Sequence, residues 1–265
     1  MRREVLKNWH KNFFRREIFT PGGPQHTAAG VKEARFVRRA LSLPRGGRLL
    51  DLCCGTGRHS IPLAKSGLEV TGLDATPAYL REAQRGARGA AVRFIKGDMR
   101  ALRYKAEFDA VINLWTSFGY FTDPRDDRKV MRGVAWALKP GGYFLIDIIN
   151  ADFLRRNAQP KRWQETPDGA YLLEDLQLFA GRDPGSINTW TLLRPGKRPA
   201  SATFFVRLYD IDRLARLLRA EGLLPVKRWG GLDGRPFHRC RSNRIVLLAR
   251  KLARKLARKP LRRPH

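Results

Sequence analysis

Between residues 45 and 150, short apolar runs alternate with longer segments whose apolar residues recur at helical spacing. The apolar runs predict strands at 48–52, 68–74, 91–98, 108–115 and 143–150. The segments between them predict helices at 58–66, 77–87 and 125–138. Strands that are apolar throughout and separated by helices are typical of a parallel sheet covered on both faces. This stretch therefore predicts an α/β core.

The pattern changes after Asn150. Three strand-like runs near 170–179, 187–194 and 202–209 are divided by the turn-forming sequences GRDPGS and RPGKRP, which predicts an antiparallel insertion. A helix near 210–222 and strands near 224–229 and 243–250 then return to the core. The expected organisation has five segments: a helical arm and lid at 1–44, the core at 45–150, the insertion at 151–209, closing elements at 210–249 and a tail at 250–265.

Charge adds a second feature. The 265 residues include 53 lysines and arginines against 24 acidic residues, a formal net charge of +29. Such a charge favours association with polyanions but does not determine the fold. Because many of the arginines stand singly in predicted helices and loops, a solvated basic surface is the simpler interpretation.

The tail concentrates this charge. Residues 249–265 contain eight cations and no acid, while Leu248, Leu252 and Leu256 recur every four residues. On a helix this pattern would be basic and amphipathic, which suits weak binding to nucleic acid or an anionic membrane. The alternative is a solvated extension of the last strand with no role of its own.

The cysteines and the apolar runs indicate the compartment. Only three cysteines are present, two of them adjacent, so no disulfide framework is expected. No apolar run approaches the roughly 18 residues that span a bilayer, and none follows the basic N-terminus as a signal peptide would require. We therefore expect a cytoplasmic protein.

The stretch LLDLCCGTGRHS, residues 49–60, places a glycine loop between a predicted strand and a predicted helix. A phosphate loop needs a lysine and an earlier glycine that are absent here. A dinucleotide loop would place glycine or alanine where Ser60 stands, which leaves that alternative open. Adjacent cysteines cannot both enter one small metal site, and His59, His238 and Cys240 match no zinc spacing, so no metal is expected.

Three acids end or follow three successive predicted strands. Asp74 lies about twenty residues after the glycines, where a carboxylate can accept both hydroxyls of a ribose. Asp98 can accept from an adenine amino group while Met99 packs on the ring. Asp51 would repel a pyrophosphate but suits an ammonium or a sulfonium. Together these residues predict an adenosine-type ligand that carries positive charge and no phosphate.

The motifs that carry a family resemblance are D-x-x-x-GTG at 51–57, Asp74, GDM at 97–99, FDAVI at 108–112 and LKPGG at 138–142. With these motifs the chain resembles class I S-adenosylmethionine (SAM)-dependent methyltransferases over residues 35–150. The resemblance implies SAM as cofactor and a Rossmann-like, seven-stranded, mostly parallel sheet. It also implies cofactor contacts from Asp51, Cys53, Gly55, Thr56, Gly57, Asp74, Ala75, Asp98, Met99, Asn113 and Leu114.

The segment NLWTSFGYF at 113–121 bears on the acceptor. It lacks the N/D-P-P-aromatic stretch of enzymes that methylate base amines and the nucleophilic cysteine of C5-methylating enzymes. It is similar to the glycine N-methyltransferase and amino-sugar N-methyltransferase group, whose members also carry an insertion after the fifth strand. The resemblance implies methyl transfer to a small-molecule amine or hydroxyl. Two alternatives are an RNA-directed methyltransferase and a non-catalytic SAM-binding interaction protein.

Position along the predicted strands suggests the acceptor residues. Tyr120 and Ser117 are the candidate catalytic residues, with Tyr120 orienting or deprotonating the acceptor or only packing at the rim. His59, on the first helical turn, is interpreted as structural. Arg207 is a candidate anchor for an acceptor carboxylate. The expected substrate contacts are Trp115, Asn150, Arg207 and Tyr209, with Trp9 and Phe13 as a lid.

Overall fold

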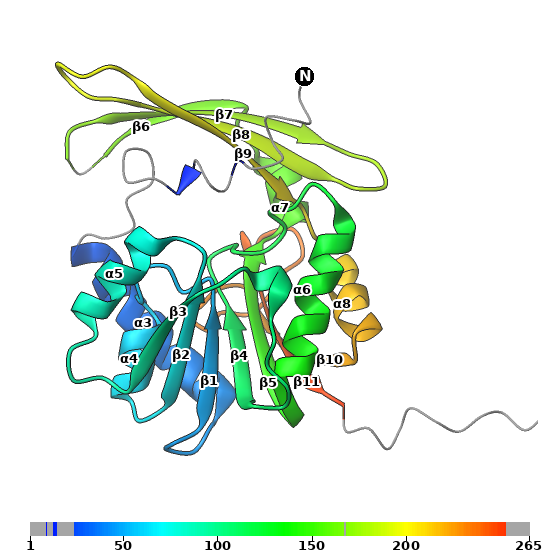
Figure 1. Ribbon diagram of the computed structural model, residues 1–265. Helices are drawn as coiled ribbons and strands as arrows, with labels where there is room; N and C mark the ends of the chain where they lie inside the picture. Colours follow the sequence, from blue (N-terminus) through cyan, green and yellow to red (C-terminus); the bar gives the residue numbers. More distant parts are fainter. Residues whose placement is uncertain (1–8, 10–12, 15–23, 167, 253–265) are drawn as a thin grey trace, which may run out of the picture.

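The computed structural model describes residues 9, 13–14, 24–166 and 168–252. Its main sheet has seven strands in the order β10-β11-β5-β4-β1-β2-β3 (Figure 1). The strands are β1 (Arg48–Leu52), β2 (Glu69–Asp74), β3 (Val92–Lys96), β4 (Phe108–Asn113), β5 (Leu138–Ile149), β10 (Leu223–Trp229) and β11 (Arg244–Lys251). β1 to β5 pair in parallel, and β11 is antiparallel to β5 and to β10. The predicted α/β fold with a seven-stranded, mostly parallel sheet is confirmed.

Helices cover both faces of this sheet. α3 (Pro24–Leu41) and α4 (Ser60–Lys65) pack on one face, and α6 (Pro124–Ala137) and α8 (Ile211–Ala220) pack on the other. α5 (Pro77–Gly86) contacts β2 and β3, and a short 3-10 turn η1 (Met99–Ala101) follows β3. None of the helices in the described part of the chain combines the length and apolar character needed to cross a bilayer.

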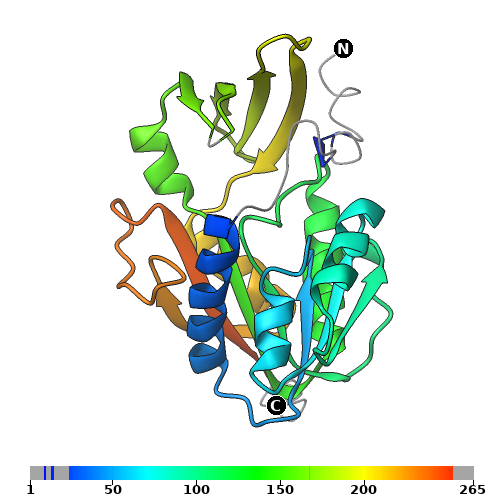
Figure 2. The same ribbon diagram turned by 90° about the vertical axis from the view of Figure 1, so that its left-hand side faces the viewer.

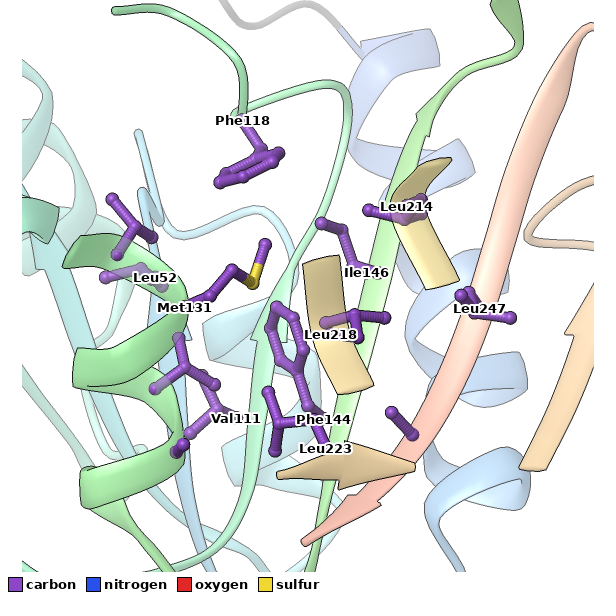
Figure 3. Close-up of a cluster of buried hydrophobic side chains, with 14 of the residues drawn as sticks. Leu52, Val111, Phe118, Met131, Phe144, Ile146, Leu214, Leu218, Leu223 and Leu247 are labelled. Atoms are coloured by element: carbon purple, nitrogen blue, oxygen red, sulfur yellow. The ribbon is translucent and has the colours of Figure 1, made fainter. Parts of the chain in front are cut away.

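The core under α6 and α8 covers one face of the central strands, and the cluster under α3 and α4 covers the other, so these strands are apolar on both faces. Figure 3 shows Val111 of β4 and Phe144 and Ile146 of β5 packed against Met131 of α6 and Leu218 of α8. All of these side chains are fully buried. Burial of each large apolar side chain stabilises the fold by about 1.5–3 kcal/mol. The packed core therefore holds the ends of the strands in fixed positions.

A second, antiparallel sheet confirms the predicted insertion. It has the order β6-β7-β8-β9, with β6 (Lys161–Glu165), β7 (Tyr171–Phe179), β8 (Gly185–Leu193) and β9 (Ala200–Arg207). Figures 1 and 2 show this sheet over the edge where the carboxyl ends of the parallel strands lie. β7, β8 and β9 correspond to the three predicted runs.

The two sheets are joined at a close backbone contact. The N–H of Arg207 on β9 donates to the carbonyl of Gly119 at 2.7 Å, in the segment that follows β4. Gly119 has φ +88, and a Cβ there would lie 2.7 Å from the Arg207 carbonyl oxygen, so only glycine fits. The insertion is thereby tied to the segment that carries the acceptor candidates.

Some elements differ from the prediction. α7 (Ala151–Asn157) and β6 were not predicted, and β5 begins at Leu138 rather than at residue 143. The helical stripe predicted for the tail is wrong at its start, because Leu248 lies in β11 opposite Leu145 and is buried. Leu252 is half-exposed beyond the strand, and Leu256 lies outside the described residues.

Candidate functional site

A cavity of about 200 Å³ opens where β1, β2, β3 and β4 end. The sheet brings the carboxyl ends of its parallel strands to one edge, so loops distant in the chain meet there. Most of the residues predicted for the site line this cavity. They are Asp51, Cys53, Gly55, Thr56, Asp74, Ala75, Asp98, Met99, Leu114, Trp115, Ser117 and Tyr120.

The glycine loop leaves its backbone open to a ligand. Gly55 has φ +55, and a Cβ there would meet no protein atom within 4 Å. Gly57, with φ +80, is instead closely surrounded by protein atoms, since a Cβ there would lie 2.9 Å from the Phe94 ring. Gly57 therefore allows the loop to pack on the core and does not line the cavity, whereas Gly55 faces free space where a ligand can approach.

Asp74 is a buried acid of the cavity wall, with 8% exposure. One carboxylate oxygen accepts the N–H of Gly55 at 2.9 Å, and the other accepts the N–H of Thr76 at 2.8 Å. Burial raises the pKa of Asp74, and these backbone donors oppose the shift. The carboxylate thus both fixes the glycine loop and presents its remaining lone pairs at the end of β2.

Asp51 and Asp98 bound the cavity on either side of Asp74. Asp51 is buried and accepts the Ser60 hydroxyl at 2.5 Å, and burial raises the pKa of its carboxyl. Asp98 is more exposed and forms an ion pair with Arg100 at 2.6 Å. Met99 is buried beside it, with its sulfur 3.6 Å from that of Cys53. The acids, the methionine and the open loop fit the expected adenosine-type ligand.

Glu33 of α3 joins several residues of the cavity wall. One of its oxygens accepts from Arg58, from His59 Nε2 at 2.7 Å and from Trp115 Nε1 at 3.1 Å. Burial alone would raise the pKa of Glu33, but the hydrogen bonds and charges of His59 and Arg58 outweigh it and lower the pKa to about 2. Glu33 therefore holds the glycine loop and the segment after β4 together.

Replacing Glu33 with glutamine tests this role. Because its pKa lies below the ordinary value, the carboxylate stabilises the fold above pH 4.5, and this contribution is lost as pH falls toward 2. We expect E33Q to lower the free energy of unfolding by about 3 kcal/mol at pH 7 and by about 2 kcal/mol at pH 3.5. Urea unfolding at the two pH values measures the difference, and an equal loss at both would contradict the assignment.

The segment after β4 carries an unusual backbone. Trp115 and Thr116 both have left-handed φ, 59 and 58, although neither is glycine. The N–H of Trp115 donates to the Asp147 carboxylate at 2.9 Å, and Thr116 N–H donates to the Asp147 carbonyl at 2.9 Å. Arg244 also binds this carboxylate. Backbone strain of this kind persists only where surrounding contacts hold it, and it is common at functional sites.

Tyr120 lies in the cavity wall, where its hydroxyl is a candidate to orient an acceptor. Burial raises its pKa well above the ordinary value, chiefly by desolvation. A raised pKa disfavours the phenolate, and a protonated phenol can orient an acceptor by hydrogen bonding. Ser117 donates its hydroxyl to the Leu114 carbonyl at 2.8 Å. Orientation of an acceptor and packing at the rim are the roles of Tyr120 that this burial favours.

The expected substrate contacts of Arg207, Tyr209 and Asn150 are not supported. The Arg207 guanidinium and the Tyr209 hydroxyl both bind one carboxylate oxygen of buried Asp127, at 2.9 and 2.6 Å. The Asn150 side chain caps α7 and donates to the carbonyls of residues 239 and 242. These residues are used inside the fold, so they are not free to contact an acceptor.

The remaining candidates lie near the cavity without lining it. Asn113 is buried and donates to the carbonyls of Leu52 and Ser117, which ties β1 to the segment after β4. Trp9 and Phe13 belong to an aromatic cluster with Phe204 of the insertion, and Trp9 Nε1 donates to the Tyr120 carbonyl at 3.0 Å. The predicted lid residues therefore pack between the insertion and the rim of the cavity.

Several cavity residues were not predicted as site residues. Arg58 and His59 directly follow the glycine motif, so their position was a signal, but their shared partner Glu33 is some 25 residues away in sequence. The other unpredicted lining residues are Phe14, Cys54, Thr76, Tyr79, Gly97 and Phe121. Thr76 and Tyr79 begin the helix after Asp74, which marks them as neighbours of a ligand bound there.

Comparisons with known proteins agree with this geometry. Residues 49–142 match a family described as "Methyltransferase domain". The chain is 35% identical over 154 residues to the putative methyltransferase YqeM of Bacillus subtilis, covering 55% of this chain and 59% of that protein. It is 36% identical over 131 residues to a glycine/sarcosine N-methyltransferase of Parasynechococcus marenigrum, covering 48% and 46%. The chain thus spans between about half and three fifths of the length of these relatives.

A solved structure resembles most of the chain in fold. The CcbJ methyltransferase from Streptomyces caelestis superposes with a TM-score of 0.76 over 94% of this chain and 98% of that one, at 21% identity. At this identity the likeness concerns the arrangement of helices and strands.

Proposed function

We propose that the chain is a SAM-dependent methyltransferase that acts on a small-molecule amine, a proposal supported by the match of residues 49–142 to the methyltransferase domain family. The observation that carries the proposal is the meeting of Asp51, Asp74 and Asp98 with the open Gly55 backbone in one cavity. A glycine/sarcosine N-methyltransferase among the relatives supports an amine as the acceptor.

The residues that would hold the cofactor follow from their positions. Asp74 accepts the ribose hydroxyls, Asp98 and Met99 receive the adenine, and the glycine loop with Asp51 receives the methionine end. When bound, SAM supplies an electrophilic methyl group on a positively charged sulfur. Buried Asp51 and Asp74 provide the negative charge that favours such a ligand.

The acceptor would meet the cofactor beside Trp115 and Tyr120. Methyl transfer by in-line displacement depends mainly on alignment, and orientation alone can supply about 7–11 kcal/mol of the barrier. Asp147 fixes the backbone at Trp115, and Trp9 fixes it at Tyr120, so these two side chains form a rigid wall. Tyr120, protonated, orients the amine through its hydroxyl.

A transfer assay tests this proposal. The protein is incubated with methyl-labelled SAM and with glycine, sarcosine, an amino sugar or a cell extract, and the methylated products are identified by mass spectrometry. We expect label on an amine with the wild-type protein and far less with Asp74→Ala when SAM is supplied near the wild-type dissociation constant. Label recovered only in RNA would favour an RNA-directed enzyme, and SAM binding with no labelled product would favour a non-catalytic protein.

The compartment and the polyanion contacts are further parts of the proposal. Free thiols at Cys53 and Cys54 in the cavity wall suit a reducing compartment, which supports a cytoplasmic enzyme. We also assign weak binding of anionic membranes or nucleic acid to the basic tail, supported by its charge alone.

Removing residues 253–265 tests the tail without shortening β11, which ends at Lys251. We expect SAM affinity and methyl transfer to stay within about twofold, because the deletion begins beyond the sheet. Sedimentation with vesicles containing phosphatidylserine at low salt should fall at least about tenfold, since each cation near an anionic surface contributes about 1 kcal/mol. Unchanged sedimentation would instead assign polyanion binding to the folded body.

A further inference from the structure

A second hollow borders the cavity on the side of α3. This basic groove has a volume of about 560 Å³ and lies between α3 and residues 232–235, before β11. Figure 2 shows α3 beside the loop that leads into β11. The groove and the cavity share Trp115 in their walls. Its cationic lining residues are Lys32, Arg35, Arg39, Arg235 and Arg244.

Two of these cations are already neutralised. Arg244 binds Asp147, and Arg235 pairs with Asp233 at 3.3 Å. Glu33, the second acid of the groove, is engaged by Arg58 and His59 as described above.

Three cations of the groove have no acidic partner among the described residues. The side chains of Lys32, Arg35 and Arg39 are exposed and form no ion pair within the part of the chain that the structure describes. Spaced three and four residues apart, they lie on one face of α3 and point positive charge at the groove. Exposure alone would fit a solvated basic surface. These three cations, however, also line a groove that shares Trp115 with the cavity.

The floor of the groove is apolar. Phe36 and Leu232 are buried there, and Phe36 packs edge-on against Trp229 with ring centroids 5.1 Å apart. Trp115, which is 47% exposed, stands where the groove meets the cavity. Its ring lies 4.1 Å from the Arg58 guanidinium and 5.5 Å from that of Arg244. An apolar floor with a cationic rim fits a ligand that has both an apolar part and an anionic group.

We infer that the basic groove binds an oxyanion, a carboxylate or a phosphate, that belongs to the acceptor. The acceptor would then carry its amine at the cavity beside Trp115, an apolar spacer over Phe36 and the oxyanion against the cations of α3. Arginine and lysine suit this contact because their hydrogen bonds to oxyanions are charge-assisted. The assignment of the oxyanion to an acceptor rests on the proposed function.

Calorimetry with three probes of similar shape tests the groove. Phenyl phosphate and phenylacetate carry the two oxyanions, and benzyl alcohol is the neutral control. Each is titrated into the full chain in the presence of SAM. The test variant is K32E/R35E, and the matched control is R216E/R219E on exposed positions of α8, which changes the net charge equally.

We expect at least one phenyl oxyanion to bind tighter than benzyl alcohol, and its affinity to fall about tenfold or more in K32E/R35E but less than twofold in R216E/R219E. The tighter of the two oxyanions identifies the anionic group. Equal losses of oxyanion affinity in both variants would show that the net charge of the protein, and not the groove, attracts the probe. Equal affinity for benzyl alcohol and the oxyanions would show a purely apolar site. Either result overturns the inference, as would a single-stranded oligonucleotide that binds far tighter and displaces the probe.

The SAM affinity of the same proteins separates this inference from the proposed function. We expect K32E/R35E to bind SAM as the wild-type chain does, because neither residue lines the cavity. If the wild-type chain binds the oxyanion but not SAM, the groove is an oxyanion site, but the assignment of that oxyanion to a methyl acceptor fails.

Discussion

Replacing Asp74 with alanine should weaken SAM binding by at least about 100-fold, since the variant loses a charged acceptor for two hydroxyls, each bond being worth roughly 1.5–3 kcal/mol. The same change frees the N–H of Gly55, which Asp74 holds at 2.9 Å, so the glycine loop also loses an anchor. Titration calorimetry measures the effect. Asn in place of Ala keeps one acceptor oxygen and should give an intermediate loss.

Asp109 supplies the control for this experiment. It lies near the start of β4, at the ends of the parallel strands that face away from the cavity, and its carboxylate pairs with Lys139 at 2.7 Å. D109A removes a carboxylate from the same sheet without touching the cavity, so SAM affinity should change by less than about threefold. A dissociation constant for folded D74A within that range of the wild-type value would remove Asp74 from the cofactor site.

Arg207→Met is expected to destabilise the fold by about 3–5 kcal/mol, the usual effect of leaving one partner of a buried ion pair unpaired. Arg207 and Asp127 are both almost fully buried. Arg207 also donates to the carbonyls of Phe121 and Thr122, so the variant should loosen the cavity rim as well. Urea unfolding measures the loss.

The pH dependence of that loss distinguishes the ion pair from simple packing. Burial already raises the pKa of Asp127 to about 6, and Arg207 opposes that rise. Without Arg207 the pKa of Asp127 rises further, and the unfolded pKa is common to both proteins. The destabilisation from the unpaired charge is therefore full above the pKa of Asp127 in the variant and disappears as pH falls below about 6, its value in the wild type. The loss should therefore be larger at pH 8 than at pH 5. D127L/R207M should recover part of the stability, and a loss independent of pH would contradict a buried charge as the cause.

The strands of the core could be predicted because burial on both faces makes them apolar throughout. β1 was predicted with the same bounds, residues 48–52, and every residue from Leu49 to Leu52 is buried. β6 could not be predicted, because all five of its residues are exposed and no alternation remains. α7 could not be predicted either, because it has only seven residues and only Ala151 among them is buried.

The residues of the site also divide into those that the sequence could predict and those that it could not. Residues adjacent to strand ends, such as Asp74 and Met99, were predicted because the parallel sheet brings those ends together. The role of Arg207 was mistaken because its partner Asp127 is 80 residues away, and spacing along the chain carries no sign of their contact. Glu33 was missed for a similar reason, since its partners Arg58, His59 and Trp115 lie on two segments distant from it in the chain.

The central claim is that this cavity binds SAM, and one titration tests it directly. Calorimetry of the wild-type chain with SAM should show one binding site that S-adenosylhomocysteine fills competitively. NAD should give no binding, because Asp51 opposes a pyrophosphate beside the glycine loop. Binding of NAD in preference to SAM, or no binding of SAM by the folded chain, would contradict the account.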